Sequence, residues 1–238
     1  VSQAENLMEE ESLNWLAEMF GYETDKFSGN IVTDGTEANE TAFWVAREWA
    51  KKELKPEGRD ILTTKLYALG SEAKHYSIVK VCHKLGFEFV QIPEKDFKTN
   101  PEAMRKRIQE LDLVNGKVAL VLGIAGGTET GIVDDLNALL KIAQENNAHF
   151  HVDAAYGGPY ILTKESQRFL GIEEADSITI DPHKMLYTPY NAGVILFKDQ
   201  DRHELITADF VNNAGYLENH ENHEKMKRMS KSRSYGNS

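Results

Sequence analysis

The 238-residue chain has one cysteine, Cys82, so it forms no internal disulfide. A lone thiol suits a reducing compartment, and we expect a cytoplasmic protein. No apolar run approaches about 20 residues, so we expect no membrane-spanning helix. Positive charge is also scarce, because 27 lysines and arginines are outnumbered by 38 acidic residues, for a formal net charge of −11. A phosphate backbone needs a basic protein surface, so nucleic acids and anionic membranes are excluded as partners.

The length and the hydrophobic fraction of 41% are enough for one large domain with a real core, or for one and a half domains. The first residue is valine, and the N-terminal residues lack the basic-then-apolar pattern of a signal peptide. We therefore expect either a processed chain or a piece of a longer protein.

Apolar periodicity predicts helices that alternate with short strands. The predicted helices cover residues 3–20, 34–52, 73–85, 101–113 and 134–146. The predicted strands cover residues 31–32, 61–67, 87–92, 118–124, 148–152, 177–180 and 193–197. Several strands are continuous apolar runs, which is typical of a mostly parallel α/β sheet with helices on both faces.

Composition divides the chain into three parts. Residues 1–25 form a helical lead-in, and residues 26–205 form the large α/β domain. Residues 206–238 are rich in Asn, His, Glu, Lys and Ser. We expect this polar tail either to be mobile or to lack the protein surface that normally packs over it.

Chemically useful residues follow several predicted strands. Gly126-Gly127-Thr128 follows residues 118–124, Asp153 follows residues 148–152, and Asp181-Pro-His-Lys184 follows residues 177–180. Ligands of open α/β sheets bind beyond the carboxyl ends of the strands. These residues are therefore the candidate site.

Two features of the segment Asp34-Gly-Thr-Glu-Ala-Asn39 suggest an anion site. A glycine and a hydroxyl at the start of a helix leave backbone N–H groups free, and the helix dipole is positive there. We expect Thr36 to be the cap of this helix. The ordinary alternative is a capped helix with no ligand.

Histidines offer a second kind of site. His149 and His151 alternate along a strand, so both rings and Asp153 share one face, which could suit a metal if further ligands exist. His220 and His223 are another pair at helical spacing, more often solvated. His75 lies near a helix start, where its ring could cover a planar ligand.

Taken alone, a strand-end aspartate such as Asp153 or a turn lysine such as Lys184 is more often an ordinary structural residue than a functional one. A lysine held in a turn after a buried strand becomes nucleophilic if it is partly desolvated. A phosphate cradle, a stacking histidine, a strand-end aspartate and a turn lysine also occur in the order that a pyridoxal phosphate (PLP) site requires. Taken together, these residues predict a PLP site and no metal.

The motifs around these residues resemble the group II PLP-dependent amino-acid decarboxylases, which include tyrosine, aromatic-L-amino-acid and glutamate decarboxylases. The resemblance runs from about Leu7 to Phe197. The matching stretches are Thr33-Asp-Gly-Thr-Glu-Ala-Asn39, Ser71-Glu-Ala-Lys-His75, Gly126-Gly-Thr-Glu-Thr-Gly131, His151-Val-Asp-Ala-Ala155 and Asp181-Pro-His-Lys184. The run Asp181-Pro-His-Lys-Met185 with Tyr187-Thr-Pro-Tyr190 is most similar to the bacterial tyrosine decarboxylases.

The resemblance implies a fold-type I large domain and catalytic roles for Lys184, Asp153 and His75. Lys184 would be the Schiff-base lysine, and Asp153 would pair with the protonated pyridine nitrogen. His75 would stack on one face of the ring, and the small Ala155 would lie against the other.

Phosphate binding is implied for Gly35, Thr36 and His183. Asp34 departs from the family, which has Ser or Gly at that position. The family's C-terminal small domain is expected to be absent from this chain, and its catalytic-loop tyrosine could not be assigned to Tyr216 or Tyr235.

The resemblance further implies a homodimer that decarboxylates an L-amino acid to an amine and CO2. We expect an aromatic substrate, with an acidic one as the alternative. Two other functions stay open: a carbon–carbon lyase of the sphingosine-phosphate lyase type, and a truncated, non-catalytic PLP-fold protein. A metal hydrolase based on His149 and His151 is a more distant alternative.

Overall fold

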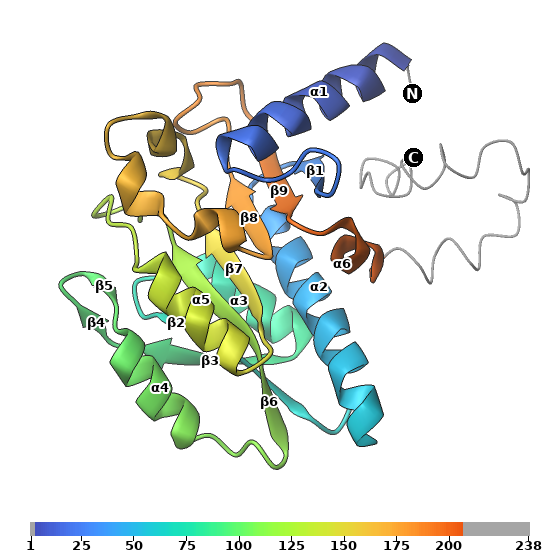
Figure 1. Ribbon diagram of the computed structural model, residues 1–238, viewed down its shortest axis with the longest axis vertical. Coiled ribbons are helices and arrows are strands. Elements are labelled where there is room, and N and C mark those ends of the chain that lie inside the picture. The colour runs from blue at the N-terminus through green and yellow to red at the C-terminus, as the bar shows by residue number, and fades with distance from the viewer. Residues whose placement is uncertain (1–2, 207–238) are drawn as a thin grey trace, which may run out of the picture.

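The computed structural model describes residues 3–206 as a mixed α/β fold with a central twisted sheet (Figure 1). The strands of this sheet are β1 (Ser28–Val32), β2 (Lys65–Ser71), β3 (Phe87–Ile92), β6 (Gly116–Ile124), β7 (His149–Asp153), β8 (Ser177–Ile180) and β9 (Gly193–Phe197). The α-helices are α1 (Gln3–Met19), α2 (Gly35–Leu54), α3 (Tyr76–Leu85), α4 (Pro101–Gln109), α5 (Leu136–Glu145) and α6 (Gln200–Glu204). A small hairpin consists of β4 (Glu94–Lys95) and β5 (Lys98–Thr99).

The central sheet has the strand order β1-β9-β8-β7-β6-β2-β3. Neighbouring strands from β8 to β3 pair in parallel, whereas β9 pairs antiparallel with both β8 and β1. The predicted mostly parallel sheet is therefore confirmed. The long apolar run of β6 is buried, and so is every residue of β8, as strands covered on both faces must be.

Helices cover both faces of the sheet, and each face has its own core (Figure 1). On one face, Phe43 of α2 and Ile78 of α3 pack with Leu120 of β6. On the other face, Met104 of α4 and Leu139 of α5 pack in the second core. Each side chain of this size contributes about 1.5–3 kcal/mol when fully buried. The two cores therefore fix the strand ends, where the candidate site lies.

Helix α2 begins at Gly35 because Asp34 caps it. The Asp34 Oδ1 atom accepts the Glu37 N–H at 3.0 Å, and the Glu37 carboxylate in turn accepts the Thr33 N–H at 3.0 Å. The first bond is an N-cap, and in the second the Glu37 side chain bonds the residue that precedes the cap. The expectation that Thr36 is the cap is wrong, because the Asp34 carboxylate satisfies the free N–H group and Thr36 lies inside the first turn.

Several boundaries differ from the sequence prediction, and two of them have a clear local cause. The strand predicted at residues 61–67 begins only at Lys65, because Asp60 accepts the N–H groups of Leu62, Thr63 and Thr64 and closes a turn. The helix predicted from residue 73 begins at Tyr76, because His75 caps it. Local polar side chains thus compete with the regular elements at both places.

No helix within residues 3–206 has the length and apolar composition that crossing a membrane requires. The predicted tail, with His220, His223, Tyr216 and Tyr235, lies outside the described residues apart from Ile206, which is buried.

Candidate functional site

The carboxyl ends of β7 and β8 bring the two central predicted residues to the same edge of the sheet. Asp153 ends β7 and is in register with Ile124 of β6 and Thr179 of β8. Lys184 follows β8 in a turn, and its N–H donates to the Asp181 carbonyl at 2.9 Å. Burial raises the pKa of the Asp181 carboxyl, and the charge of Asp153 adds to this shift. The predicted gathering of polar groups at this edge is therefore present.

Asp153 is held from two sides. Its Oδ2 atom accepts the side-chain amide of Asn39 in α2 at 3.0 Å, and its Oδ1 atom accepts the Ala155 N–H at 3.1 Å. The carboxylate is only partly buried, and a carboxylate offers about four lone-pair positions. Asp153 can therefore accept one more hydrogen bond from a ligand.

Lys184 forms an ion pair with Asp181, with 2.7 Å between Nζ and Oδ2. The lysine side chain is 31% exposed, whereas the aspartate side chain is only 3% exposed. Burial raises the pKa of Asp181, and the nearby charges of Lys184 and His183 oppose this shift. The second oxygen, Oδ1, is buried and has no hydrogen-bond partner among the described residues.

Gly35 is buried at the start of α2 and lies directly against Asp181. A Cβ atom at this position would lie 2.8 Å from the Asp181 Oδ2 atom, so a larger residue would displace the carboxylate. Thr36 is partly buried in the same first turn. The positive end of the helix dipole and the Asp181–Lys184 pair thus meet at one point.

His183 lies deep beside Asp181. Its Nδ1 atom accepts the Ala192 N–H at 3.1 Å, its Nε2 atom is 3.8 Å from the Asp181 Oδ2 atom, and its ring stacks on Tyr190 with 4.3 Å between centroids. Because Nδ1 accepts a hydrogen, the neutral ring carries its proton on Nε2 and can donate from there.

His75 is exposed at the N-cap of α3, whereas the cluster described above lies at the start of α2 and after β8. Its Nδ1 atom is 2.7 Å from the Ser77 hydroxyl, and its ring leans on Tyr76. These contacts are local to α3, so the described side-chain bonds do not connect His75 to Asp153 or Lys184.

A buried polar network lies behind Asp153. Asn39 connects Asp153 to His151, with 2.9 Å between Oδ1 and Nε2, and Ser177 lies between the rings of His151 and His149. Burial lowers the pKa of His151 to about 4, although the Asp153 charge opposes the shift. Burial likewise lowers the pKa of His149 well below its usual value. Both rings are therefore neutral at pH 7.

Sequence reasoning missed Asn39 and Ser177, and it considered the two histidines only as metal ligands. In the structure both rings bond to Ser177, and residues 3–206 contain no cluster of three His, Cys, Asp or Glu side chains able to hold a metal. A polar residue on the buried face of a helix, such as Asn39, is the one signal that could have indicated the network.

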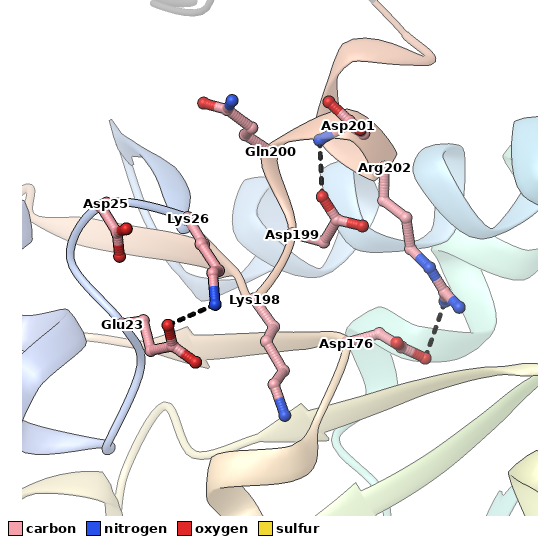
Figure 2. A pocket seen from close by; sticks show the side chains of 9 residues that line it. All are labelled: Glu23, Asp25, Lys26, Asp176, Lys198, Asp199, Gln200, Asp201 and Arg202. Atoms are coloured by element: carbon pink, nitrogen blue, oxygen red, sulfur yellow. Dashed lines mark hydrogen bonds and ion pairs between the residues drawn. The ribbon is translucent and has the colours of Figure 1, made fainter.

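A pocket of about 590 Å³ lies at the opposite edge of the sheet (Figure 2). Asp176 precedes β8 and Lys198 follows the antiparallel β9, so both mark the end of the strands away from Asp153. The charged side chains that line this pocket largely pair with one another. Arg202 pairs with Asp176 at 2.8 Å, and Lys26 pairs with Glu23. This pocket is therefore separate from the candidate site.

The glycine-rich turn after β6 packs tightly against the segment after β7. Gly126 has φ +86°, and a Cβ atom there would collide with the backbone of Gly157. We expect Gly126→Ala to lower the free energy of unfolding by about 2–5 kcal/mol, from the left-handed backbone and the overpacking together. Urea denaturation measures this change.

Gly131→Ala is the matched control for that substitution. Gly131 has φ +67° but open space around it, so alanine there tests the backbone cost alone, about 1–2 kcal/mol. Equal losses for the two variants would contradict the proposed close packing.

The pyridoxal-dependent decarboxylase conserved domain matches residues 2–235 of the chain. The chain belongs to this family. It is 37% identical over 199 residues to the aspartate 1-decarboxylase of Aliivibrio fischeri, covering 76% of this chain and 36% of that protein. It is 35% identical over 193 residues to the aromatic-L-amino-acid decarboxylase of Bacillus atrophaeus, covering 79% of this chain and 38% of that protein.

Solved structures agree with this family assignment. The crystal structure of Oryza sativa TDC with PLP and tryptamine superposes with a TM-score of 0.80 at 26% identity, covering 96% of this chain and 49% of that one. The chain thus spans about half or less of the length of these relatives. The family depends on pyridoxal, which confirms the predicted family, fold and cofactor.

The described residues fit PLP. Asp153 has a lone pair to spare for a ring nitrogen, and Lys184 supplies an amine at the same sheet edge. A helix N-terminus with a glycine at its first position suits a phosphate.

Proposed function

We propose that this chain is the cofactor-binding part of a PLP-dependent amino-acid decarboxylase, with residues 26–205 as the binding unit. The observation that carries the proposal is the meeting of Asp153 and the Lys184–Asp181 pair at one sheet edge, beside the start of α2. Because the chain belongs to a pyridoxal-dependent family, the chemistry that we propose for this arrangement is that of PLP.

Gly35, Thr36 and His183 would hold the cofactor phosphate. Gly35 lets the backbone approach closely, and the first turn of α2 presents N–H groups and a positive dipole. His183 can donate from Nε2. Ala155, which is small and buried beside Asp153, would leave room for the planar ring, and His75 would cover it from α3.

Lys184 would hold the cofactor by condensing with its aldehyde, whose oxygen would leave as water. An amine attacks only after it loses its proton, and the Asp181 Oδ2 atom, 2.7 Å away, is positioned to take that proton. Burial raises the pKa of Asp181, which makes its carboxylate a better proton acceptor.

Asp153 would accept a hydrogen bond from the ring nitrogen and keep it protonated. A negative charge at this position stabilises the positive form of a basic group. When bound, PLP supplies an electron sink for the bond that breaks at the substrate Cα. The role of Asp153 is to keep that sink charged.

We propose an aromatic L-amino acid as the substrate, with an acidic one as the second candidate. The relatives above include an aromatic-L-amino-acid decarboxylase and an aspartate 1-decarboxylase, so both side chains are represented. We also propose a cytoplasmic homodimer, the assembly that the resemblance to this family implies; sedimentation of the chain with PLP tests the dimer.

Substrate assays test the proposal directly. We expect the protein with PLP to release CO2 and the corresponding amine from L-tyrosine, and more slowly from L-aspartate. A faster reaction with L-aspartate would reverse the substrate assignment. Aldehyde release without CO2 would instead indicate a carbon–carbon lyase, and no turnover with any L-amino acid would indicate a non-catalytic role.

A further inference from the structure

A row of buried polar side chains runs from Asp153 through the layer between the sheet and α2. Successive partners are 2.7–3.4 Å apart. In order from the far end, the members are Arg202, His149, Ser177, His151, Asn39 and Asp153. The row therefore connects the site to the opposite edge of the sheet.

The carboxylate fixes the direction of the first bonds in this row. Ionised Asp153 can only accept, so Asn39 must turn its amide N–H toward Asp153 and its oxygen toward His151. The amide oxygen also only accepts. The His151 Nε2 atom, 2.9 Å away, must therefore carry a hydrogen.

The remaining bonds follow in the same direction. In a neutral His151 ring, Nδ1 is bare and accepts the Ser177 hydroxyl at 2.8 Å, and its longer 3.2 Å contact with the Ser177 carbonyl then carries no hydrogen. That uses the only hydroxyl proton, so the Ser177 oxygen accepts from His149 Nε2 at 2.7 Å. The His149 Nδ1 atom is then bare, and it faces the Arg202 guanidinium at 3.4 Å. Every donor thus points toward Asp153.

Arg202 anchors the far end of the row. It pairs with Asp176 at 2.8 Å, as Figure 2 shows, and its guanidinium lies over the Trp49 ring at 4.0 Å. Because a guanidinium has no acceptor, it cannot reverse the direction of the row. Aligned hydrogen bonds of this kind polarise and strengthen one another.

We propose that His151 is a positioning residue which, with Ser177 and Asn39, holds the Asp153 carboxylate in place and aimed at the cofactor nitrogen. The inference rests on the proposed function, because it assigns Asp153 the ring nitrogen as its partner. Asp181 is a charged group that acts on Asp153, and it in turn faces Lys184 and His183. The row supplies donors to Asp153, whereas Asp181 repels its charge.

The direction of the row is tested in the cofactor-free protein. Histidine side-chain ¹⁵N NMR at pH 7 is expected to show His149 and His151 neutral, each with its proton on Nε2. A proton on Nδ1 of His151, or a charged His151 ring, would overturn the inference whether or not PLP binds.

Ser177→Ala tests the effect on the cofactor, because Ser177 does not touch Asp153. We expect PLP to bind about tenfold more weakly in titrations without substrate, a typical coupling for one member of a network. His151→Phe should weaken binding further, and adding Ser177→Ala to it should change little, since the row is already cut.

Thr179→Val is the matched control. Thr179 is a buried hydroxyl residue on the same face of β8, 3.5 Å from the His151 Nε2 atom, but it lies outside the row. We expect PLP affinity within about twofold of wild type, since this contact is at the limit of a hydrogen bond. Equal PLP affinities for Ser177→Ala and wild type would overturn the role proposed for the row but would leave the proposed function standing. No PLP binding by wild type would overturn the proposed function.

Discussion

Lys184→Ala is expected to abolish covalent attachment of PLP and to lower decarboxylation by about 10³-fold or more, as loss of a covalent catalytic group does. The amine of Lys184 is the one that the structure holds beside Asp153 and the start of α2, through its ion pair with Asp181. The visible absorbance of the bound cofactor and the rate of CO2 release measure the two effects.

Two controls separate loss of the amine from loss of the ion pair. Lys184→Ala leaves Asp181 buried without its partner, so the double variant Lys184→Ala with Asp181→Asn removes that charge as well. It should be equally unable to attach PLP. Lys106→Ala, at an exposed position on α4, should behave as wild type. Covalent PLP in the Lys184→Ala variant would show that another lysine is used.

Asp153→Asn is expected to lower turnover by about 10²–10³-fold, the usual cost of removing one preorganised electrostatic group. Asparagine has the same shape but no charge, so it cannot hold the ring nitrogen protonated. It also has only one acceptor oxygen, whereas Asn39 and the Ala155 N–H both donate to residue 153. One of these donors loses its partner, and PLP affinity should fall too.

Asp135→Asn is the matched control for this charge change. Asp135 caps α5 by accepting the Ala138 N–H at 3.0 Å, and asparagine caps helices equally well. Its turnover should equal that of wild type. If Asp153→Asn retained turnover within about twofold of wild type, the proposed role of Asp153 would be wrong.

The order of strands and helices, and the residues at the strand ends, could be predicted because both follow from local pattern. Apolar residues identified β6, β7 and β8, and Asp153 ends β7 whereas Lys184 lies in the turn after β8. Parallel strands share one carboxyl edge, so the meeting of these residues followed from the fold class.

The partners of these residues could not be predicted, because they depend on how α2 packs on the sheet. Asn39 and Asp153 are 114 residues apart in the chain, and nothing local pairs them. The contact of Gly35 with Asp181 is equally remote. The start of α2 was also predicted wrongly, because the Asp34 side chain caps the helix in place of Thr36.

Borohydride reduction of the PLP-treated protein, followed by mass mapping of its peptides, tests the central claim most directly. Reduction fixes the cofactor to the nitrogen that holds it. The account predicts one phosphopyridoxyl group, on the peptide that contains Lys184 and on no other. An unlabelled protein, or a label scattered over exposed lysines such as Lys106, would contradict it.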